Sequence, residues 1–160
     1  MQLFLYLIFV AGIVGVDQIT KYLTVANIAL GQDVPFLPGF LGLTYVQNTG
    51  AAFSSFEGMQ WLFALIFVVF TAGVIWEYRK QSFHLSRFEW WCLMAVYGGG
   101  LGNMIDRVRM GYVVDMIETT FMEFPVFNVA DCFITCGCIA LMAHLVLCNK
   151  AFWKDGKKKN

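Results

Sequence analysis

Long uncharged stretches constrain the fold of this chain more than any other feature. Residues 3–16 and 60–76 contain no charged side chain. About 20 apolar residues are needed for a helix to cross a bilayer, and spans are predicted over about 2–25, 60–78, 88–105 and 128–148. The chain is 59% hydrophobic and only 14% charged, whereas soluble domains carry about a quarter charged residues. The sequence therefore predicts a single integral membrane domain built as a bundle of four transmembrane helices.

The segment between the first two spans has a different character. Residues 31–58 contain two of the three prolines and five glycines, which excludes a continuous helix. Residues 41–48 (LGLTYVQN) read as a short strand bounded by glycine and by the turn sequence NTG. A second short strand is predicted in GYVVDMIE, after Gly111. The fold class is thus membrane all-α with a small β element, and the apolar 31–58 loop is expected to pack down on the membrane surface.

Charge distribution sets the predicted orientation. Four spans place both termini, the loop 79–87 and the tail 149–160 on one side, leaving loops 26–59 and 106–127 on the other. The first side carries eight of the eleven basic residues, and the positive-inside rule makes it cytoplasmic. The basic residues on that side are Arg79, Lys80, Arg87, Lys150, Lys154, Lys157, Lys158 and Lys159. Eight of the eleven acidic residues fall on the other side: Asp17, Asp33, Glu57, Asp106, Asp115, Glu118, Glu123 and Asp131. Any chemistry is therefore expected at the extracytoplasmic face.

Several other features favour structural interpretations. A formal net charge of zero gives no basic excess for nucleic-acid binding. Gly98 and Gly102 form a small-xxx-small pair that lets a neighbouring helix approach closely. His144, alone in an apolar span, is expected to be hydrogen-bonded within the bundle rather than to bind a ligand. The five cysteines lie in apolar segments, which favours packing over disulfides; they are Cys92, Cys132, Cys136, Cys138 and Cys148.

Two carboxylates at the edges of apolar segments require an explanation, because charge beside hydrocarbon is costly. Alternation on its strand puts Asp115 on one face with Val113 and Ile117, where partial desolvation favours the protonated acid. Asp131 has a structural interpretation, because Asn128 is positioned to cap the fourth helix and the helix dipole favours an acid in its first turn. If Asp115 and Asp131 meet, they share a proton, and one can activate water while the other polarises a carbonyl. Spacing alone does not show that they meet.

Asp17 and Lys21 are four residues apart and share one face of the first span. Two interpretations stay open for them. They tie down the end of the helix as an ion pair, or they contribute to a site, since polar groups on membrane helices often line cavities.

Five short motifs, in order along the chain, resemble those of lipoprotein signal peptidase, the type II signal peptidase of bacteria. The motifs are DQITK (17–21), NTGAAFS (48–54), GGGLGNMIDR (98–107), GYVVDMI (111–117) and FPVFNVAD (124–131). They cover most of the outer half of the chain and coincide with four predicted spans.

This resemblance implies an intramembrane aspartyl endopeptidase that removes the signal peptide from prolipoproteins, just before the cysteine that carries a diacylglyceryl group. By matching motifs it implies Asp115 and Asp131 as the catalytic pair and Asp17 and Lys21 as supporting residues. It also implies that six residues line the substrate groove: Asn48, Gly50, Asn103, Arg107, Asn128 and Ala130.

The same resemblance implies an extracytoplasmic β-cradle on a four-helix bundle in the bacterial inner membrane, contact with membrane lipids, no cofactor, and inhibition by globomycin-type cyclic peptides. Two positions depart from the family pattern. Met116 stands where phenylalanine is frequent, and Cys132 stands where a small residue is common. Neither departure removes a residue of the catalytic pair or of the groove.

Three other functions compete with a peptidase. A proton-coupled transporter subunit would show internal repeats and acids near the midplane, whereas the acids here crowd one end. A metal-dependent enzyme would use oxygen ligands suited to Mg²⁺ or Ca²⁺, from Asp106, Asp115, Glu118 and Asp131. A non-enzymatic scaffold gives no reason for acids beside hydrocarbon. Outside the pair, Asp106, Glu118 and Glu123 are expected to have surface or structural roles.

Overall fold

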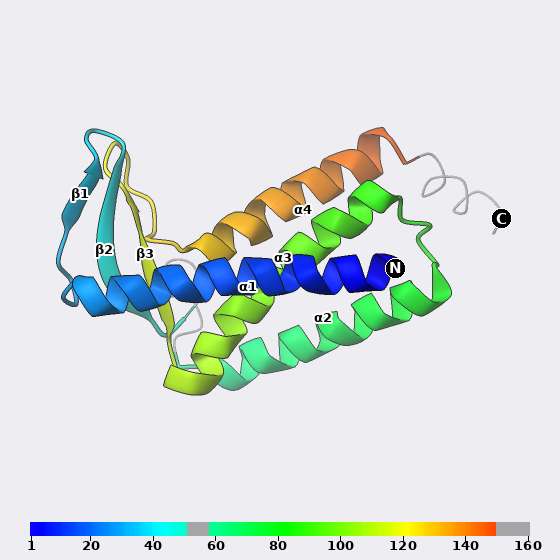
Figure 1. Ribbon diagram of the computed structural model, residues 1–160, viewed down its shortest axis with the longest axis horizontal. Coiled ribbons are helices and arrows are strands. Elements are labelled where there is room, and N and C mark those ends of the chain that lie inside the picture. Colours follow the sequence, from blue (N-terminus) through cyan, green and yellow to red (C-terminus); the bar gives the residue numbers. More distant parts are fainter. Residues whose placement is uncertain (51–57, 150–160) are drawn as a thin grey trace.

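The computed structural model describes residues 1–50 and 58–149. Four helices run along the long axis of the molecule, and a small sheet lies across one end of them (Figure 1). The elements in chain order are α1 (Gln2–Asn27), β1 (Val34–Leu37), β2 (Leu41–Asn48), α2 (Gln60–Lys80), α3 (Arg87–Met110), β3 (Val113–Thr119) and α4 (Val129–Leu147). The N-terminus, the α2–α3 connection and the end of α4 all lie at the end away from the sheet.

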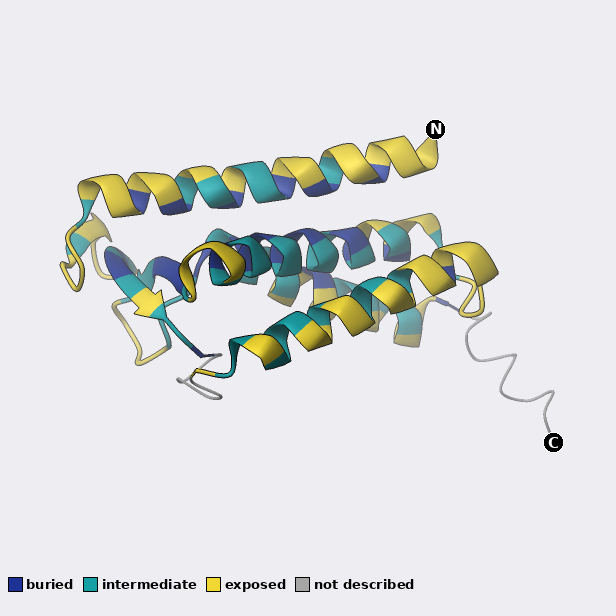
Figure 2. Cartoon of the chain, turned by 90° about the horizontal axis from the view of Figure 1, so that it is seen from below, coloured by how far each residue is buried: buried dark blue, intermediate teal, exposed yellow. Residues whose placement is uncertain are grey.

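Among the described residues, three helices are long and apolar enough to cross a membrane: α1, α2 and α4. Their outward faces carry large exposed hydrophobic side chains, such as Val68 and Val69 on α2 and Ile139 on α4. Figure 2 shows the buried residues of α1, the helix that starts at the N label, on the side facing the other helices. Apolar side chains outside and polar ones inside are what a lipid environment requires.

The fourth helix, α3, packs against each of the other three. It is less apolar because it carries buried polar side chains, including Glu89, Asn103 and Asp106. Its N-terminus is closed by a capping box between Ser86 and Glu89. At its other end Gly111 adopts a left-handed conformation with φ 79°, which ends the helix.

The glycines of α3 allow close contact with its neighbours, as the small-residue spacing predicts. A Cβ added at Gly98 would lie 3.1 Å from the Cβ of Ile13 on α1. One added at Gly102 would lie 2.5 Å from an oxygen of Asp17, and one at Gly99 would collide with the carbonyl of Ala130. Glycine at these positions therefore brings α1 and α4 against the backbone of α3.

The sheet is antiparallel, with strand order β1-β2-β3. The prediction for residues 41–48 matches β2, and β3 occupies most of the second predicted strand. Thr44 and Tyr45 lie opposite the single residue Met116, a β-bulge that bends the sheet. The strand β1 was not predicted, because Pro35 within it is tolerated only in an edge strand or at a bulge.

Helix bounds agree with the predicted spans to within two residues, except at the end of α3. The predicted loop 106–127 begins too early, because α3 continues to Met110. The charged residues Asp106 and Arg107 suggested a boundary, but Asp106 is buried between helices and does not interrupt α3. Residues 51–57, which include most of the NTGAAFS motif and part of the loop expected on the membrane surface, lie outside the described residues, as does the tail 150–160.

Candidate active site

Asp115 lies in β3, with only 2% of its surface exposed. Its Oδ2 accepts a hydrogen bond of 2.8 Å from the side-chain amide of Asn48 in the paired strand β2. Its Oδ1 accepts one of 2.6 Å from the side-chain amide of Asn128. Val113 lines the same cavity as Asp115, as alternation predicts, whereas Ile117 packs against the cluster of Tyr45, Val114 and Met116. The bulge opposite Met116 breaks the simple alternation of the strand.

Asp131 lies in the first turn of α4 and forms a capping box with Asn128, as its structural interpretation predicts. Asn128 Oδ1 accepts from the Asp131 N–H at 3.0 Å, and Asp131 Oδ2 accepts from the Asn128 N–H at 3.1 Å. The other oxygen, Oδ1, accepts a hydrogen bond of 2.7 Å from the side-chain amide of Asn103. The Asp131 carboxylate therefore caps α4 with one oxygen and is hydrogen-bonded to α3 with the other.

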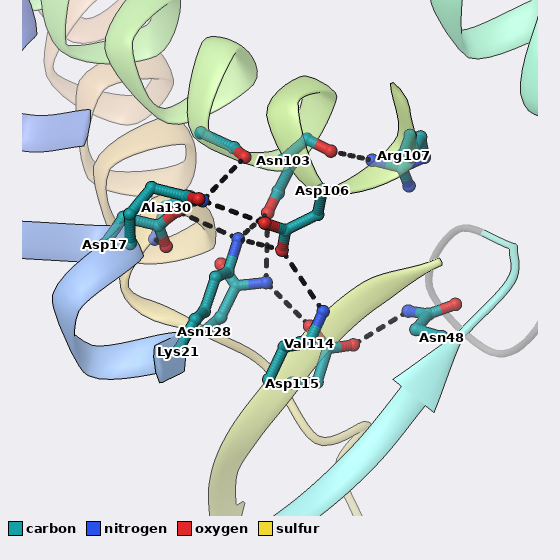
Figure 3. Close-up of polar contacts among 12 residues, drawn as sticks. Asp17, Lys21, Asn48, Asn103, Asp106, Arg107, Val114, Asp115, Asn128 and Ala130 are labelled. Carbon is teal, nitrogen blue, oxygen red and sulfur yellow. Dashed lines mark hydrogen bonds and ion pairs between the residues drawn. The ribbon is translucent and has the colours of Figure 1, made fainter. Parts of the chain in front are cut away.

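Two asparagines connect the two carboxylates. Asn128 donates from its side-chain nitrogen to Asp115 and also to Asn103 Oδ1, at 3.1 Å. Asn103 in turn donates to Asp131. A continuous set of amide hydrogen bonds thus runs from β3 through the start of α4 to α3. Figure 3 shows Asn103 and Asn128 beside Lys21.

Behind the asparagines lies a buried ion network on α1 and α3. Lys21 Nζ lies 2.9 Å from Asp17 Oδ2, 2.8 Å from Asp106 Oδ2 and 2.8 Å from Asn103 Oδ1 (Figure 3). Asp17 also accepts from the Ala130 N–H at 3.0 Å, which ties α1 to the start of α4. Asp17 and Lys21 therefore form an ion pair, and Lys21 also contacts Asn103, the asparagine that donates to Asp131.

Asp106 and Gln18 belong to this network, although sequence reasoning did not assign them to the site. Gln18 donates to Asp106 at 2.8 Å, and the Val114 N–H donates to Asp106 at 3.3 Å. The spacing held a usable signal. Asn103, Asp106 and Arg107 are three and four residues apart, so they share one face of α3.

Arg107 and Gly50 contact each other beside the carboxylates. Arg107 donates to the carbonyl of Gly50 at 2.9 Å, and its guanidinium stacks 4.3 Å from the ring centre of Phe63 on α2. The Gly50 N–H donates to Asn48 Oδ1 at 2.9 Å, so the same asparagine holds both Gly50 and Asp115. Ala130, with no exposed surface, lies behind the carboxylates against α3 rather than in a cavity.

Both carboxylates line an apolar cavity of about 740 Å³ between α2, α3 and α4. Its walls are mainly apolar side chains, such as Phe67, Phe70 and Ile134, and Asn48, Asn103 and Arg107 contribute polar atoms near the acids. A mostly apolar hollow with a few convergent polar groups is the usual form of a ligand site.

Burial raises the pKa of Asp115 to about 6, since desolvation disfavours the charged form. The hydrogen bond from Asn48 opposes that shift, and the negative charge of Asp131 adds to it. A carboxyl with a pKa near 6 exchanges a proton close to neutral pH. The pair of Asp115 and Asp131 has the groups needed for general acid and base catalysis.

The four oxygen donors considered for a metal do not gather at one point. Asp106 is paired with Lys21, and Glu118 lines a separate groove beside the sheet. Within residues 1–50 and 58–149, no three His, Cys, Asp or Glu side chains are arranged to hold a metal ion. His144 accepts or donates a bond of 3.0 Å with Glu89, which confirms that it is hydrogen-bonded within the bundle.

Known proteins resemble this chain in sequence and in fold. Residues 9–147 match the family model described as signal peptidase (SPase) II. A lipoprotein signal peptidase of Enterococcus faecalis is 46% identical over 97% of this chain and 95% of its own length. One of Streptococcus pyogenes serotype M2 is 43% identical over 89% of each chain.

A solved structure of a bacterial membrane enzyme, obtained by the in meso method at 2.3 Å resolution, superposes with a TM-score of 0.82. It is 30% identical in sequence and covers 97% of this chain and 91% of its own. The architecture, the residues that the family model matches and the near full-length relatives agree, and this chain belongs to the signal peptidase II family.

Proposed function

We propose that this protein is an intramembrane aspartyl endopeptidase that removes the signal peptide from diacylglyceryl-modified prolipoproteins, cleaving just before the lipidated cysteine. Asp115 and Asp131 form its catalytic pair. The observation that carries this proposal is the amide-linked arrangement of two carboxylates on the wall of one apolar cavity. Family membership supports the general reaction, which is cleavage of a lipoprotein precursor.

The raised pKa of Asp115 supports a division of roles within the pair. Asp115 carries the shared proton and donates a hydrogen bond to the oxygen of the scissile carbonyl. Asp131, beside the N–H groups that begin α4, takes a proton from the attacking water. The tetrahedral intermediate then collapses with transfer of a proton to the departing amine. One water is consumed, giving a carboxylate on the signal peptide and an amino group on the lipidated cysteine.

The apolar cavity is suited to a substrate that brings its own hydrocarbon. The diacylglyceryl chains would lie between α2, α3 and α4, against Phe67 and Phe70. Asn48, Gly50, Asn103 and Asn128 would hold the extended peptide near the carboxylates, directly or by positioning one another. Ala130 would act from behind, as a close contact of α3 that fixes the start of α4.

Arg107 would bind the polar part of the lipidated residue. Its Nε is buried and has no hydrogen-bond partner among the described residues, while its terminal nitrogens bond to Gly50 and Asn103. An ester oxygen of the diacylglyceryl group is an acceptor that the guanidinium could bind. Globomycin-type cyclic peptides would compete for the same cavity.

We further propose that α3 completes a set of four membrane spans, with both termini in the cytoplasm and the sheet acting as an extracytoplasmic β-cradle. The four spans would correspond to α1, α2, α3 and α4, and the whole chain would form one membrane domain. The excess of basic residues in the loop 79–87 and the tail 149–160 of the sequence supports this orientation. It would place the active site at the outer edge of the bacterial inner membrane, where water reaches it easily and a signal helix in the bilayer presents its scissile bond.

The decisive experiment is cleavage of a diacylglyceryl prolipoprotein by the purified protein in lipid. Asp115→Asn should reduce turnover at least about 10³-fold, because an amide cannot donate or accept the proton as the acid does. The unlipidated precursor should be cut at least about tenfold more slowly than the lipidated one. Substantial turnover by Asp115→Asn would contradict the catalytic pair, and equal cleavage of both precursors would contradict the lipid site.

A further inference from the structure

A second hollow adjoins the apolar cavity at the candidate active site. This groove, of about 1010 Å³, is lined by the end of β2, by β3 and by the segment 120–126. Asp115 and Asn48 line both the groove and the cavity, so the two hollows adjoin at the candidate catalytic acid. No helix contributes to the described lining of the groove, whereas the cavity lies between three helices.

We propose that this groove receives the extended segment of the substrate that follows the scissile bond, and that Glu118 and Glu123 make it select against acidic segments. The inference rests on the peptidase function proposed above. A signal helix occupies the membrane side of the scissile bond, and the lipid of the cysteine fits the apolar cavity. The chain beyond the cysteine must leave Asp115 on the aqueous side, where the groove begins.

The walls of the groove suit an extended backbone. Amide and hydroxyl side chains of Gln47, Thr49 and Thr119 line it, and such groups hydrogen-bond peptide groups without regard to sequence. Asp115 and Thr119 are four residues apart on β3, a distance of about 13 Å at about 3.3 Å per residue. An extended substrate running alongside would place about four residues in the groove.

The charged residues of the groove other than Asp115 are Glu118 and Glu123, and no basic residue is part of its described lining. Glu118 pairs with Gly42 of β2 in the sheet, and its carboxylate has no hydrogen bond or ion pair with any described residue. A Cβ added at Gly42 would lie 3.3 Å from Glu118 Oε2, so this glycine leaves room for the carboxylate over β2. Glu118 lies three residues beyond Asp115, or about 10 Å along the strand, which corresponds to the third residue after the scissile bond.

The test compares lipidated precursors that differ only at the second to fourth residues after the scissile bond, where all three are Lys, Gln or Glu. We expect kcat/KM of the wild-type enzyme to be about tenfold higher for the Lys form than for the Glu form at low ionic strength, and the ratio to shrink in salt. Glu118→Gln with Glu123→Gln should bring that ratio below about twofold.

Two matched controls isolate the groove. Asp33→Asn removes an exposed outer acid that is not part of the groove lining, and it should keep the tenfold ratio. The same Lys and Glu changes placed about ten residues after the bond should have no effect on the wild type.

Two results would overturn the inference while the peptidase function stands. In the first, the wild-type enzyme cleaves the Gln form efficiently and shows no preference for the Lys form over the Glu form. In the second, the double variant keeps the preference for the Lys form that the wild type shows. If none of the substrates is cleaved, the peptidase proposal itself fails, and the groove assignment fails with it.

Discussion

Both α3 and α4 begin with a capping box, but the acidic residues of the two boxes lie in different surroundings. Ser86 and Glu89 form a capping box at the start of α3, and Asn128 and Asp131 form one at the start of α4. Each acid accepts the N–H of its cap residue and receives a further bond from another helix. In isolation the two helix starts would be judged equivalent.

Their surroundings separate them. Glu89 has no exposed surface, and its oxygens are occupied by His144 and by Asn149 as well as by the cap. It lines neither the apolar cavity nor the groove. Asp131 lines the cavity and is connected through Asn103 and Asn128 to a second carboxylate. Asp131 is a candidate catalytic residue because it lines a cavity and is connected to a second carboxylate. Glu89 has a structural role because neighbouring side chains enclose it.

The largest expected contrast comes from the same change in both boxes. Asp131→Asn should lower kcat for lipoprotein-precursor cleavage at least about 10³-fold, because it removes the proposed base. Glu89→Gln should change kcat less than about fivefold but lower the unfolding free energy by about 1–3 kcal/mol, because an NH2 group replaces one of the two oxygens that accept from buried donors. Turnover and unfolding in mixed detergent micelles measure the two effects. Loss of turnover by a stably folded Glu89→Gln protein would contradict a purely structural role for Glu89.

The ion network behind Asp131 has no counterpart beside Glu89 among the described residues. Lys21→Met should therefore destabilise the protein by about 3–5 kcal/mol, because it leaves Asp17 and Asp106 buried without their cation. Asn149→Ala, which removes a neutral partner of Glu89, should cost about 1–3 kcal/mol. In a double-mutant cycle, Asp17→Asn should recover part of the loss in Lys21→Met. Strict additivity would argue against a coupled network.

Close packing of α1 on α3 beside the ion network of Asp17, Lys21 and Asp106 can be tested by adding one methyl group. Gly102→Ala should cost about 1–3 kcal/mol, because its Cβ would meet the Asp17 carboxylate and displace α1 from α3. Gly73→Ala is the matched control, since α2 has open space there, and it should change stability by less than about 1 kcal/mol. The same denaturation assay measures both. Equal stability of the two variants would mean that α1 does not depend on this contact.

The smallest expected effect is the pH dependence of stability at Asp115. Its folded pKa of about 6 lies above the ordinary value of 3.8, so the folded state holds the proton more tightly than the unfolded state. The contribution of the Asp115 carboxyl to the free energy of unfolding is therefore present at low pH and is lost as the pH rises from about 4 to about 6. Asp115→Asn should gain a few degrees in Tm relative to wild type between pH 4 and pH 7.

Asp33→Asn, which removes an exposed acid outside the site, is the matched control measured over the same pH range. A flat difference for Asp115→Asn would show that the Asp115 carboxyl is well solvated. That result would remove the electrostatic reason for assigning it the shared proton.

Local sequence was sufficient for most of the secondary structure. The uncharged stretches predicted the helices, and LGLTYVQN predicted β2, because hydrophobic length and β-branched content act over neighbouring residues. The capping interpretation of Asp131 and the small-residue spacing of α3 are confirmed for the same reason. The strand β1 was missed because it depends on pairing with β2 at an edge that tolerates Pro35.

Tertiary structure decided which acids belong together. Asp106 looked like the first residue of a loop, yet packing of α1 on the glycines of α3 buries it against Lys21. The meeting of Asp115 with the Asn128 amide depends on where β3 returns to the start of α4. Such contacts join residues far apart in the chain or held by separate elements, so no local spacing encodes them. The sequence alone determined a membrane bundle with acids at one end, and its motifs pointed to Asp115 and Asp131 by resemblance. Only packing brings those two carboxylates to the wall of a common cavity.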